Sequence, residues 1–179
     1  MLEEKNLFCI IALMKNLIFL IIALIFIELS FETFAGSKVK VVDGDSLEMG
    51  NKRIRLIGID APEYFQECYD AAGKAYNCGK EAKKYLEDLV EKGQAKGQKV
   101  KCRAEDVDRY KRSLSECQIG DVRLNLEMVK AGFAVAYKDE RYKMLEKRAK
   151  ERKIGIWQGK FMRPELYRAI KRKEEEQKK

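Results

Sequence analysis

The sequence has no histidine, and it contains only two prolines and no Cys-x-x-Cys pair. The missing imidazole excludes Ser-His-Asp and Cys-His catalysis and histidine-ligated zinc, because each of them needs that side chain. The missing cysteine pair argues against a zinc site built from thiolates. Any hydrolytic chemistry must therefore depend on carboxylates, arginines and a metal held by oxygen, the ligand that calcium and magnesium prefer.

Positive charge is in excess along the chain. The 179 residues are enough for one domain with a hydrophobic core. Lysines and arginines number 37 against 29 aspartates and glutamates, which gives a net charge of +8. This excess favours a polyanionic partner, either nucleic acid or an anionic membrane surface. The alternative is that the charge serves solubility alone.

The amino-terminal segment is typical of a targeting sequence. Residues 17–27 form an unbroken apolar run preceded by Lys15, and the small residues Thr33 and Ala35 come before a candidate cleavage site at Gly36. A basic start, a short apolar run and small residues at its end predict a secretory signal peptide. We therefore expect a secreted or otherwise extracytoplasmic protein.

Two further features of this segment leave alternatives open. Met14 is the better candidate initiator, because the glutamates close to Met1 do not suit the basic start of a signal peptide. Residues 7–14 are also apolar, so the combined stretch is long enough to be an uncleaved membrane anchor. We expect a membrane partner only in that second case.

Cysteine usage agrees with export. Cys9 lies in the targeting segment, which leaves an even set of four cysteines at 68, 78, 102 and 117. An even set in an exported protein predicts disulfides. Of the three pairings, the most local joins Cys68 to Cys78 and Cys102 to Cys117. The alternative is four buried free thiols.

Two short segments place carboxylates and an arginine where the pattern predicts buried strands. Asp43 and Asp45 flank Gly44, which allows a bulge or a close approach of the backbone. Arg55 and Asp60 belong to the next predicted strand and its end. Burying several carboxylates together is costly unless cations lie between them. A divalent metal and a phosphate bound by arginine would both compensate.

The wider pattern predicts an α+β fold that is mainly a β barrel. We expect strands at 38–49 (broken at Gly44), 53–59, 99–103, 114–119 and 133–137, a loop at 64–77, and helices at 80–90, 124–130 and 140–153. Five short strands with about three helices suit an OB-fold five-stranded barrel, an architecture that binds nucleic acid. The chain then divides into a signal peptide or anchor (1–35), a barrel domain (36–160) and a basic tail (161–179), which we expect to be disordered.

Three motifs resemble the staphylococcal nuclease family. They are Val-Asp-Gly-Asp-Ser at 42–46, Ile-Arg-Leu-Ile-Gly-Ile-Asp-Ala-Pro-Glu at 54–63 and Asp-Arg-Tyr-Lys-Arg at 108–112, and Gly-Ile-Trp at 155–157 is similar to the family's end. The resemblance runs from about residue 38 to 157, or two-thirds of the chain. It implies a nuclease on an OB-type barrel that uses Ca²⁺, cleaves DNA or RNA at the bond to the 5′ oxygen and leaves 3′-phosphate products.

The resemblance also assigns metal ligands. Asp45 and Asp60 match the calcium-binding carboxylates, with the carbonyl of Ala61 as a further oxygen ligand. Asp43 would hold the metal's waters. The family often has threonine where Ala61 stands, so alanine would keep a backbone ligand but could not replace an interaction of the threonine hydroxyl. The alternative for Asp43-Gly44-Asp45 is a plain turn.

The catalytic and substrate residues follow from the same motifs. Arg55 and Arg112 would clamp the phosphate, Glu63 would be the general base, and Tyr110 and Tyr137 would bind the substrate. Four of these five residues also have an alternative interpretation that follows from their own sequence context. Arg55 would pair with one of the two aspartates, Arg112 would be a solvated loop residue, Glu63 would act only electrostatically, and Tyr137 would be half-buried core.

The expected function is therefore an exported, monomeric, calcium-dependent nuclease. The first alternative is a non-catalytic nucleic-acid-binding module of the same fold, which retention of Arg55, Glu63 and Arg112 disfavours because degenerate relatives lose such residues. The second is a membrane-anchored interaction protein that uses the basic tail. We expect that tail to add to binding and not to catalysis.

Overall fold

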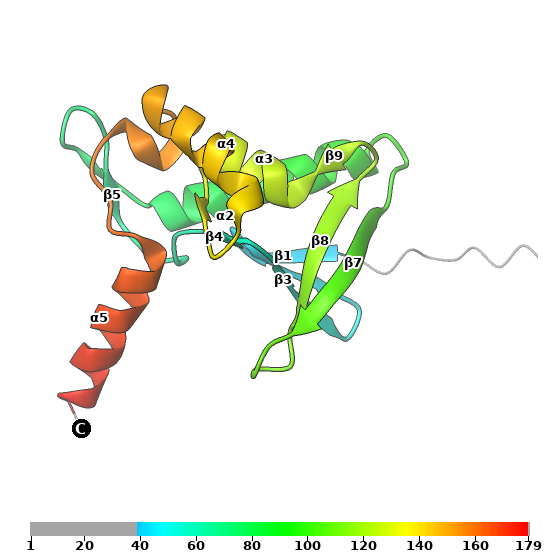
Figure 1. The fold of residues 1–179 in the computed structure, drawn as a ribbon, viewed down its shortest axis with the longest axis horizontal. Helices are drawn as coiled ribbons and strands as arrows, with labels where there is room; N and C mark the ends of the chain where they lie inside the picture. The colour runs from blue at the N-terminus through cyan, green and yellow to red at the C-terminus, as the bar shows by residue number, and fades with distance from the viewer. Residues whose placement is uncertain (1–38, 179) are drawn as a thin grey trace, which may run out of the picture. The chain divides into compact units, whose positions relative to one another are not determined.

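The computed structural model describes residues 39–178 (Figure 1). The predicted signal peptide or anchor therefore lies outside the described residues. Within them, none of the helices combines the length and apolar character that crossing a membrane requires.

Short strands and helices alternate along the chain. The strands are β1 (Val39–Asp43), β2 (Ser46–Met49), β3 (Lys52–Leu56), β4 (Ile59–Asp60), β5 (Cys68–Tyr69), β6 (Ala75–Tyr76), β7 (Val100–Val107), β8 (Ser113–Ile119), β9 (Val122–Arg123) and β10 (Val135–Ala136). The helices are α2 (Cys78–Gln94), α3 (Leu124–Lys130), α4 (Glu140–Glu151) and α5 (Pro164–Glu176), with a 3₁₀ turn at Gly155–Gln158.

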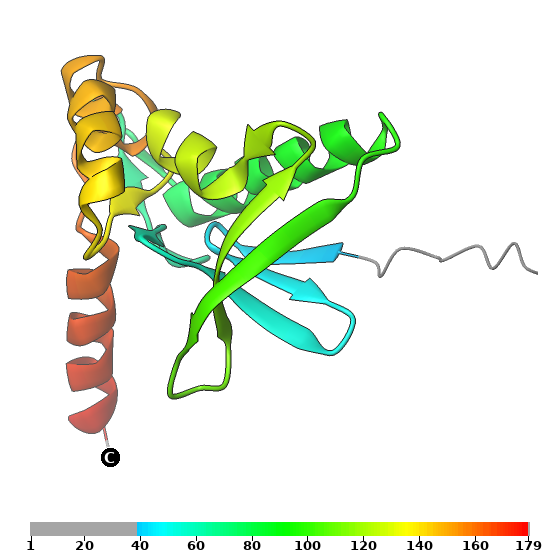
Figure 2. The ribbon, with the colours of Figure 1, turned by 45° about the vertical axis from the view of Figure 1, so that its right-hand side comes forward.

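The main sheet curls into a half-barrel with the strand order β1-β2-β3-β8-β7, and β9 is paired to β8 (Figure 2). Neighbouring strands are antiparallel except β3 and β8, which are parallel. This arrangement confirms the predicted OB-type α+β fold. Two small antiparallel pairs, β4–β10 and β5–β6, lie outside the main sheet.

The β1–β2 turn depends on Gly44. A Cβ at this position would lie 2.7 Å from the Cβ of Ala61 and 2.8 Å from that of Ala82 on α2, so only glycine permits the approach. The Asp45 amide donates to a carboxylate oxygen of Asp43 at 3.0 Å, a common way for aspartate to close a turn. The motif therefore forms the turn that the alternative interpretation expected. The same turn places Asp45 in the interior, where the residue is 3% exposed.

The core lies between the half-barrel and the helices α2 and α3. On α2 the buried Ala82, Leu86 and Val90 follow a spacing of four residues, and the Asn77 side chain caps the helix by accepting the Lys80 amide. Side chains that are entirely buried from the two layers include Leu47, Leu56, Leu86, Ile119 and Met128. Each such side chain stabilises the fold by roughly 1.5–3 kcal/mol.

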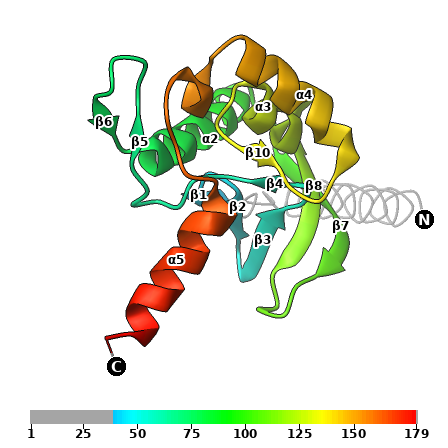
Figure 3. The same cartoon turned by 60° about the vertical axis from the view of Figure 1, so that its left-hand side comes forward.

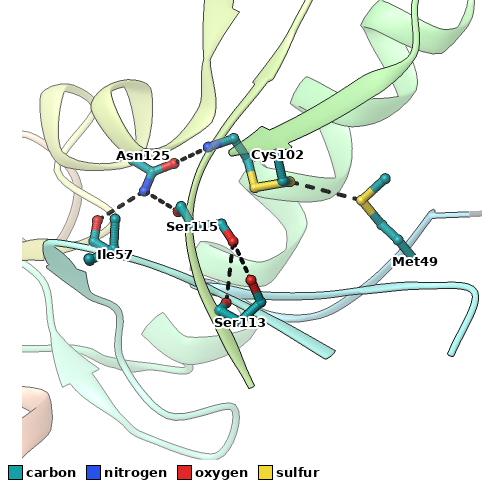
Figure 4. Close-up of a disulfide and its surroundings, with 7 residues drawn as sticks. Met49, Ile57, Cys102, Ser113, Ser115 and Asn125 are labelled. Carbon is teal, nitrogen blue, oxygen red and sulfur yellow. Dashed lines mark hydrogen bonds between the residues drawn. A yellow bond between two sulfur atoms is a disulfide. The ribbon is translucent and has the colours of Figure 1, made fainter. Parts of the chain in front are cut away.

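A buried asparagine joins the barrel to α3 (Figure 4). The Asn125 side-chain amide donates to the carbonyls of Ile57 (2.9 Å) and Ser115 (3.0 Å), and its oxygen accepts the Cys117 amide at 3.0 Å. These bonds hold the end of β3 against β8 where the two strands are parallel. The strand that carries Arg55 is thereby fixed relative to the strand that follows Arg112.

The structure contains both of the local disulfides, Cys68–Cys78 and Cys102–Cys117. The second one joins directly paired residues of β7 and β8. The segment predicted as a loop at 64–77 contains the β5–β6 hairpin instead, which the first disulfide connects to the start of α2.

The prediction that the tail is disordered is wrong. Residues 164–176 form the helix α5, and Pro164 occupies its first turn, where a missing backbone donor costs nothing. This helix projects away from the body of the domain and ends at the C-terminus (Figure 3). It is the one α-helix beyond the three expected within the described residues.

Candidate active site

A cleft of about 580 Å³ lies between the β7–β8 turn, the end of β3 and the helix α5. Its walls are formed by Asp43, Arg53, Arg55, Glu63, Arg109, Tyr110, Arg112, Tyr137, Glu165, Arg168 and Arg172. Six of these residues are arginines and three are carboxylates, so the cleft attracts anions. It brings together six of the predicted residues, namely Asp43, Arg55, Glu63, Arg112, Tyr110 and Tyr137.

Asp45 lies beneath this cleft in a fully partnered position. One carboxylate oxygen accepts the Ser46 hydroxyl at 3.0 Å and Arg55 Nη1 at 2.7 Å. The other accepts the backbone amide of Ala61 at 3.0 Å. Burial raises the pKa of Asp45 to about 7, although the nearby Arg55 guanidinium opposes that shift. A cation beside this carboxylate therefore favours its charged form.

Arg55 joins the two predicted metal ligands. Its Nη1 donates to Asp45 and its Nη2 to Asp60 Oδ1, both at 2.7 Å, and Asp60 is completely buried. This is the ion pair that the alternative interpretation of Arg55 expected. Arg55 also lines the cleft, so a phosphate that entered could be contacted from the same position. Its role as a phosphate ligand stays a prediction.

Arg168 of α5 contacts both the predicted metal site and the predicted base. Its Nη1 lies 2.9 Å from Asp60 Oδ1 and 2.7 Å from Glu63 Oε1, and its Nη2 lies 2.9 Å from Asp60 Oδ2. The guanidinium thus links one predicted metal ligand, Asp60, to the predicted base, Glu63. The tail therefore contacts the predicted catalytic residues directly, and the expectation that it adds to binding and not to catalysis stays a prediction.

Glu63 is held at the cleft by its backbone. Its amide donates to the side chain of buried Gln66 at 3.2 Å, and Gln66 in turn donates to the carbonyl of Met162, just before α5, at 2.6 Å. A Cβ at Gly79 on α2 would lie 1.8 Å from the Glu63 carbonyl oxygen, so glycine is required where the helix packs against this loop. The Glu63 side chain is 39% exposed and faces the cleft.

Arg112 is oriented by Asp108 at the β7–β8 turn. Asp108 accepts the amides of Tyr110 and Arg112 with one oxygen and Arg112 Nε with the other, at 2.8–2.9 Å. Burial alone would raise the pKa of Asp108, but the Arg112 amide and guanidinium outweigh it and lower that pKa. Arg53 of β3 donates to the Tyr110 carbonyl at 2.6 Å, which fixes the turn over the cleft. Arg112 is therefore a positioned residue and not a freely solvated one.

The two tyrosines have different surroundings. Tyr110 is 53% exposed and lies below the guanidinium carbons of Arg109 (4.9 Å) and Arg112 (5.6 Å). Tyr137 is half-buried, and its amide donates to the Gly58 carbonyl at 2.9 Å. Both line the cleft, so stacking on a nucleotide and partial burial are compatible for Tyr137.

The donor set fits a hard divalent cation. Asp45 and Asp60 supply buried carboxylate oxygens and Ala61 is 3% exposed beside them, while two guanidiniums balance their charge in this structure. Within residues 39–178, no group of three or more acidic, cysteine or histidine side chains could hold a metal. A cation would therefore have two protein carboxylates, and its remaining ligands would be backbone oxygen, water or substrate.

Sequence reasoning missed three contributors to the site: Arg168, Gln66 and Asp108 as a positioning residue. Arg168 and Gln66 carry no distinctive local pattern, because each acts through a contact with a distant segment. Asp108 opens the 108–112 motif, and its contact with Arg112 is local. A usable signal existed for the helix of Arg168, since Pro164 followed by Glu165 is a typical helix start.

Comparisons with known proteins find similar sequences over most of the described residues. The family model described as staphylococcal nuclease homologue matches residues 53–159. An uncharacterized endonuclease of Haemophilus influenzae is 37% identical over 128 residues, or 66% of this chain and 64% of the relative. A micrococcal nuclease of Shigella flexneri is 31% identical over 143 residues, or 69% and 74%.

A third similar protein carries a different kind of name. The succinoglycan biosynthesis protein ExoI of Rhizobium meliloti is 30% identical over 126 residues, or 68% of this chain. The alignment spans 64% of that relative's length, as it does for the Haemophilus protein. The residues matched by the family model end before α5, so Arg168 lies outside them.

Proposed function

The chain belongs to the staphylococcal nuclease family, and we propose that it is a calcium-dependent nuclease that hydrolyses phosphodiester bonds of DNA or RNA. The observation that carries the proposal is the convergence of Arg55, Glu63 and Arg112 on one arginine-rich cleft above buried Asp45 and Asp60. Nuclease names among the relatives support it.

The side chains of the cleft suit an attack of water on phosphorus. Glu63 accepts a proton from the attacking water. The water oxygen bonds to phosphorus, and the bond between phosphorus and the 5′ oxygen breaks. That proton finally resides on the departing 5′ oxygen, and the products are a 3′-phosphate and a 5′-hydroxyl. Arg55 and Arg112 stabilise the negative charge that grows on the phosphoryl oxygens.

Asp45 and Asp60 would hold the calcium ion with the Ala61 carbonyl. When bound, the ion supplies positive charge that polarises the phosphoryl oxygen. Arg55 pairs with both carboxylates and Arg168 pairs with Asp60, so a bound cation would replace these partners in whole or part. A freed Arg55 lies at the cleft wall, where a phosphate is the natural new partner.

Cleavage of a labelled oligonucleotide by the purified full chain tests the proposal. We expect cleavage with Ca²⁺, none with a chelator, and loss of at least ~10²-fold in kcat for Arg112→Ala, the scale of removing one transition-state donor. Arg103→Ala is the matched control, because Arg103 lies on β7 and pairs with Glu105 away from the cleft. Calcium-independent cleavage, or equal effects of the two variants, would contradict the proposal.

We also propose that the protein is exported. Two disulfides support an oxidising compartment, because such bonds are rare in the cytosol. Amino-terminal sequencing of the protein from its native cells tests this. A start at Gly36 supports a cleaved signal peptide, whereas a retained apolar segment in the membrane fraction supports the anchor.

A further inference from the structure

A second groove, which we call the α5 groove, opens between the loop after Glu63 and the helix α5. One wall is formed by Tyr64 and Phe65, and the other by Tyr167, Lys171 and Arg172, around a volume of about 350 Å³. Apart from Glu63 and Glu175, the residues that line this groove are aromatic or basic. The proposed cleavage mechanism gives this groove no role. Its α5 wall lies outside the residues that the family model matches.

The α5 groove is continuous with the catalytic cleft. Glu63, Arg168 and Arg172 line both of them, so a strand bound in one leads into the other across the predicted base. A phosphodiester chain longer than one or two nucleotides must leave the cleft along its walls. The groove offers such a path along the exposed face of α5.

The aromatic wall presents an exposed ring. Phe65 is 73% exposed, although a buried phenylalanine would stabilise the fold by roughly 1.5–3 kcal/mol. Its ring packs edge-on against Tyr64 at 4.8 Å between centroids, and Lys80 and Lys83 lie 5.7 and 5.4 Å from the Tyr64 ring. The Tyr64 ring is thus held from two sides, and Phe65 keeps an open face toward solvent.

Charge selects the occupant. Two lysines of α2 and three basic residues of α5 outnumber the lining carboxylates Glu63 and Glu175 around the aromatic pair, which suits a polyanion with flat apolar groups. A stacked base needs a free face, which a paired base inside a duplex does not offer. We propose that the α5 groove binds unpaired nucleotides of a single-stranded nucleic acid, with Phe65 stacking on a base and the α5 cations contacting phosphates. This subsite rests on the proposed nuclease function.

Fluorescence anisotropy of a labelled 12-nucleotide single strand, measured on the full chain with a calcium chelator, tests the subsite without cleavage. We expect Phe65→Ala to weaken binding by about 5- to 150-fold, the range for removing the stacking of one base, and Phe65→Trp to restore it. Tyr69→Ala is the control, because Tyr69 is also an exposed aromatic residue (47%) but lies on β5 outside the groove.

The outcomes separate the two proposals. Equal affinity of Phe65→Ala and Tyr69→Ala, or an equal loss for duplex and single strand, would overturn the subsite. A Phe65-dependent single-strand affinity in a protein that hydrolyses no nucleic acid would keep the subsite and remove the proposed nuclease function. Calcium-dependent cleavage together with binding that does not depend on Phe65 would keep the proposed nuclease function and remove the subsite.

Discussion

Replacement of Arg168 by glutamine should make the protein bind calcium more tightly. The guanidinium of Arg168 makes three hydrogen bonds with Asp60 and Glu63 at 2.7–2.9 Å, and it must leave or shift before a cation shares Asp60. Glutamine keeps part of the side-chain length and removes the charge. The apparent affinity for calcium then no longer includes the free energy of breaking this ion pair.

The magnitude follows from the burial of the two partners. Asp60 is fully buried, whereas the Arg168 side chain is 29% exposed. Exposed pairs contribute about 0–1 kcal/mol and breaking a fully buried pair costs about 3–5 kcal/mol. An intermediate value of about 2 kcal/mol corresponds to a roughly 30-fold lower Kd for calcium.

Isothermal titration calorimetry of the full chain with Ca²⁺ measures this change directly. Arg172→Gln is the matched control, because it removes the same charge one turn further along α5 and also lines the cleft. The control should shift the Kd by less than about threefold, the effect of a screened charge at longer range. An Arg168→Gln variant that binds calcium like the control, or more weakly than the wild type, would refute the proposed competition between Arg168 and calcium for Asp60.

Three further outcomes are expected. Asp45→Asn should abolish the rise in Tm that Ca²⁺ gives the wild type, because it removes a buried carboxylate ligand; an unchanged calcium-dependent rise would exclude Asp45 from the site. Asp108→Asn should lower kcat by about tenfold by releasing Arg112. The lowered Asp108 pKa contributes stability that is present above about pH 4 and lost as the pH falls through the folded pKa, so this variant should also lack that acid-side loss in denaturation curves. Reduction of Cys102–Cys117, which closes a separation of 15 residues, should lower stability by about 3 kcal/mol; full alkylation of both thiols in the native protein would contradict the bridge.

Much of the fold was predictable because short-range sequence patterns determine it. The alternation in β1 and β3 and the four-residue spacing on α2 express a buried face directly. The predicted helix at 124–130 has the observed bounds of α3. The hairpin β5–β6 was not predictable in this way, because two-residue strands show no period and depend on the disulfide and on the bridge from Tyr69 to Lys160.

The site was predictable where the residues lie in the motifs and their neighbouring strands. Arg55 lies on β3 and Arg112 directly precedes β8, and these two strands are parallel neighbours, so sheet topology brings both arginines to one cleft. Arg168 reaches the same cleft from 105 residues beyond Glu63, through a helix whose exposed surface is mostly charged. Charge along such a segment indicates a solvated face as readily as a binding one. Only the position of the first turn of α5 decides between them.

That position depends on a few contacts near the start of the helix. Gln66 fixes the chain at Met162, and Arg163 donates to Glu146 at 3.0 Å, whereas the last turns of α5 are exposed. Loss of the Arg168 ion pairs on cation binding would therefore leave α5 held at its base alone. A spin label near the end of α5 should gain mobility when calcium is added to the wild type, and in Arg168→Gln it should be mobile already without calcium. Equal mobility of the label in wild type and Arg168→Gln, with and without calcium, would show that calcium binding does not change how α5 is held.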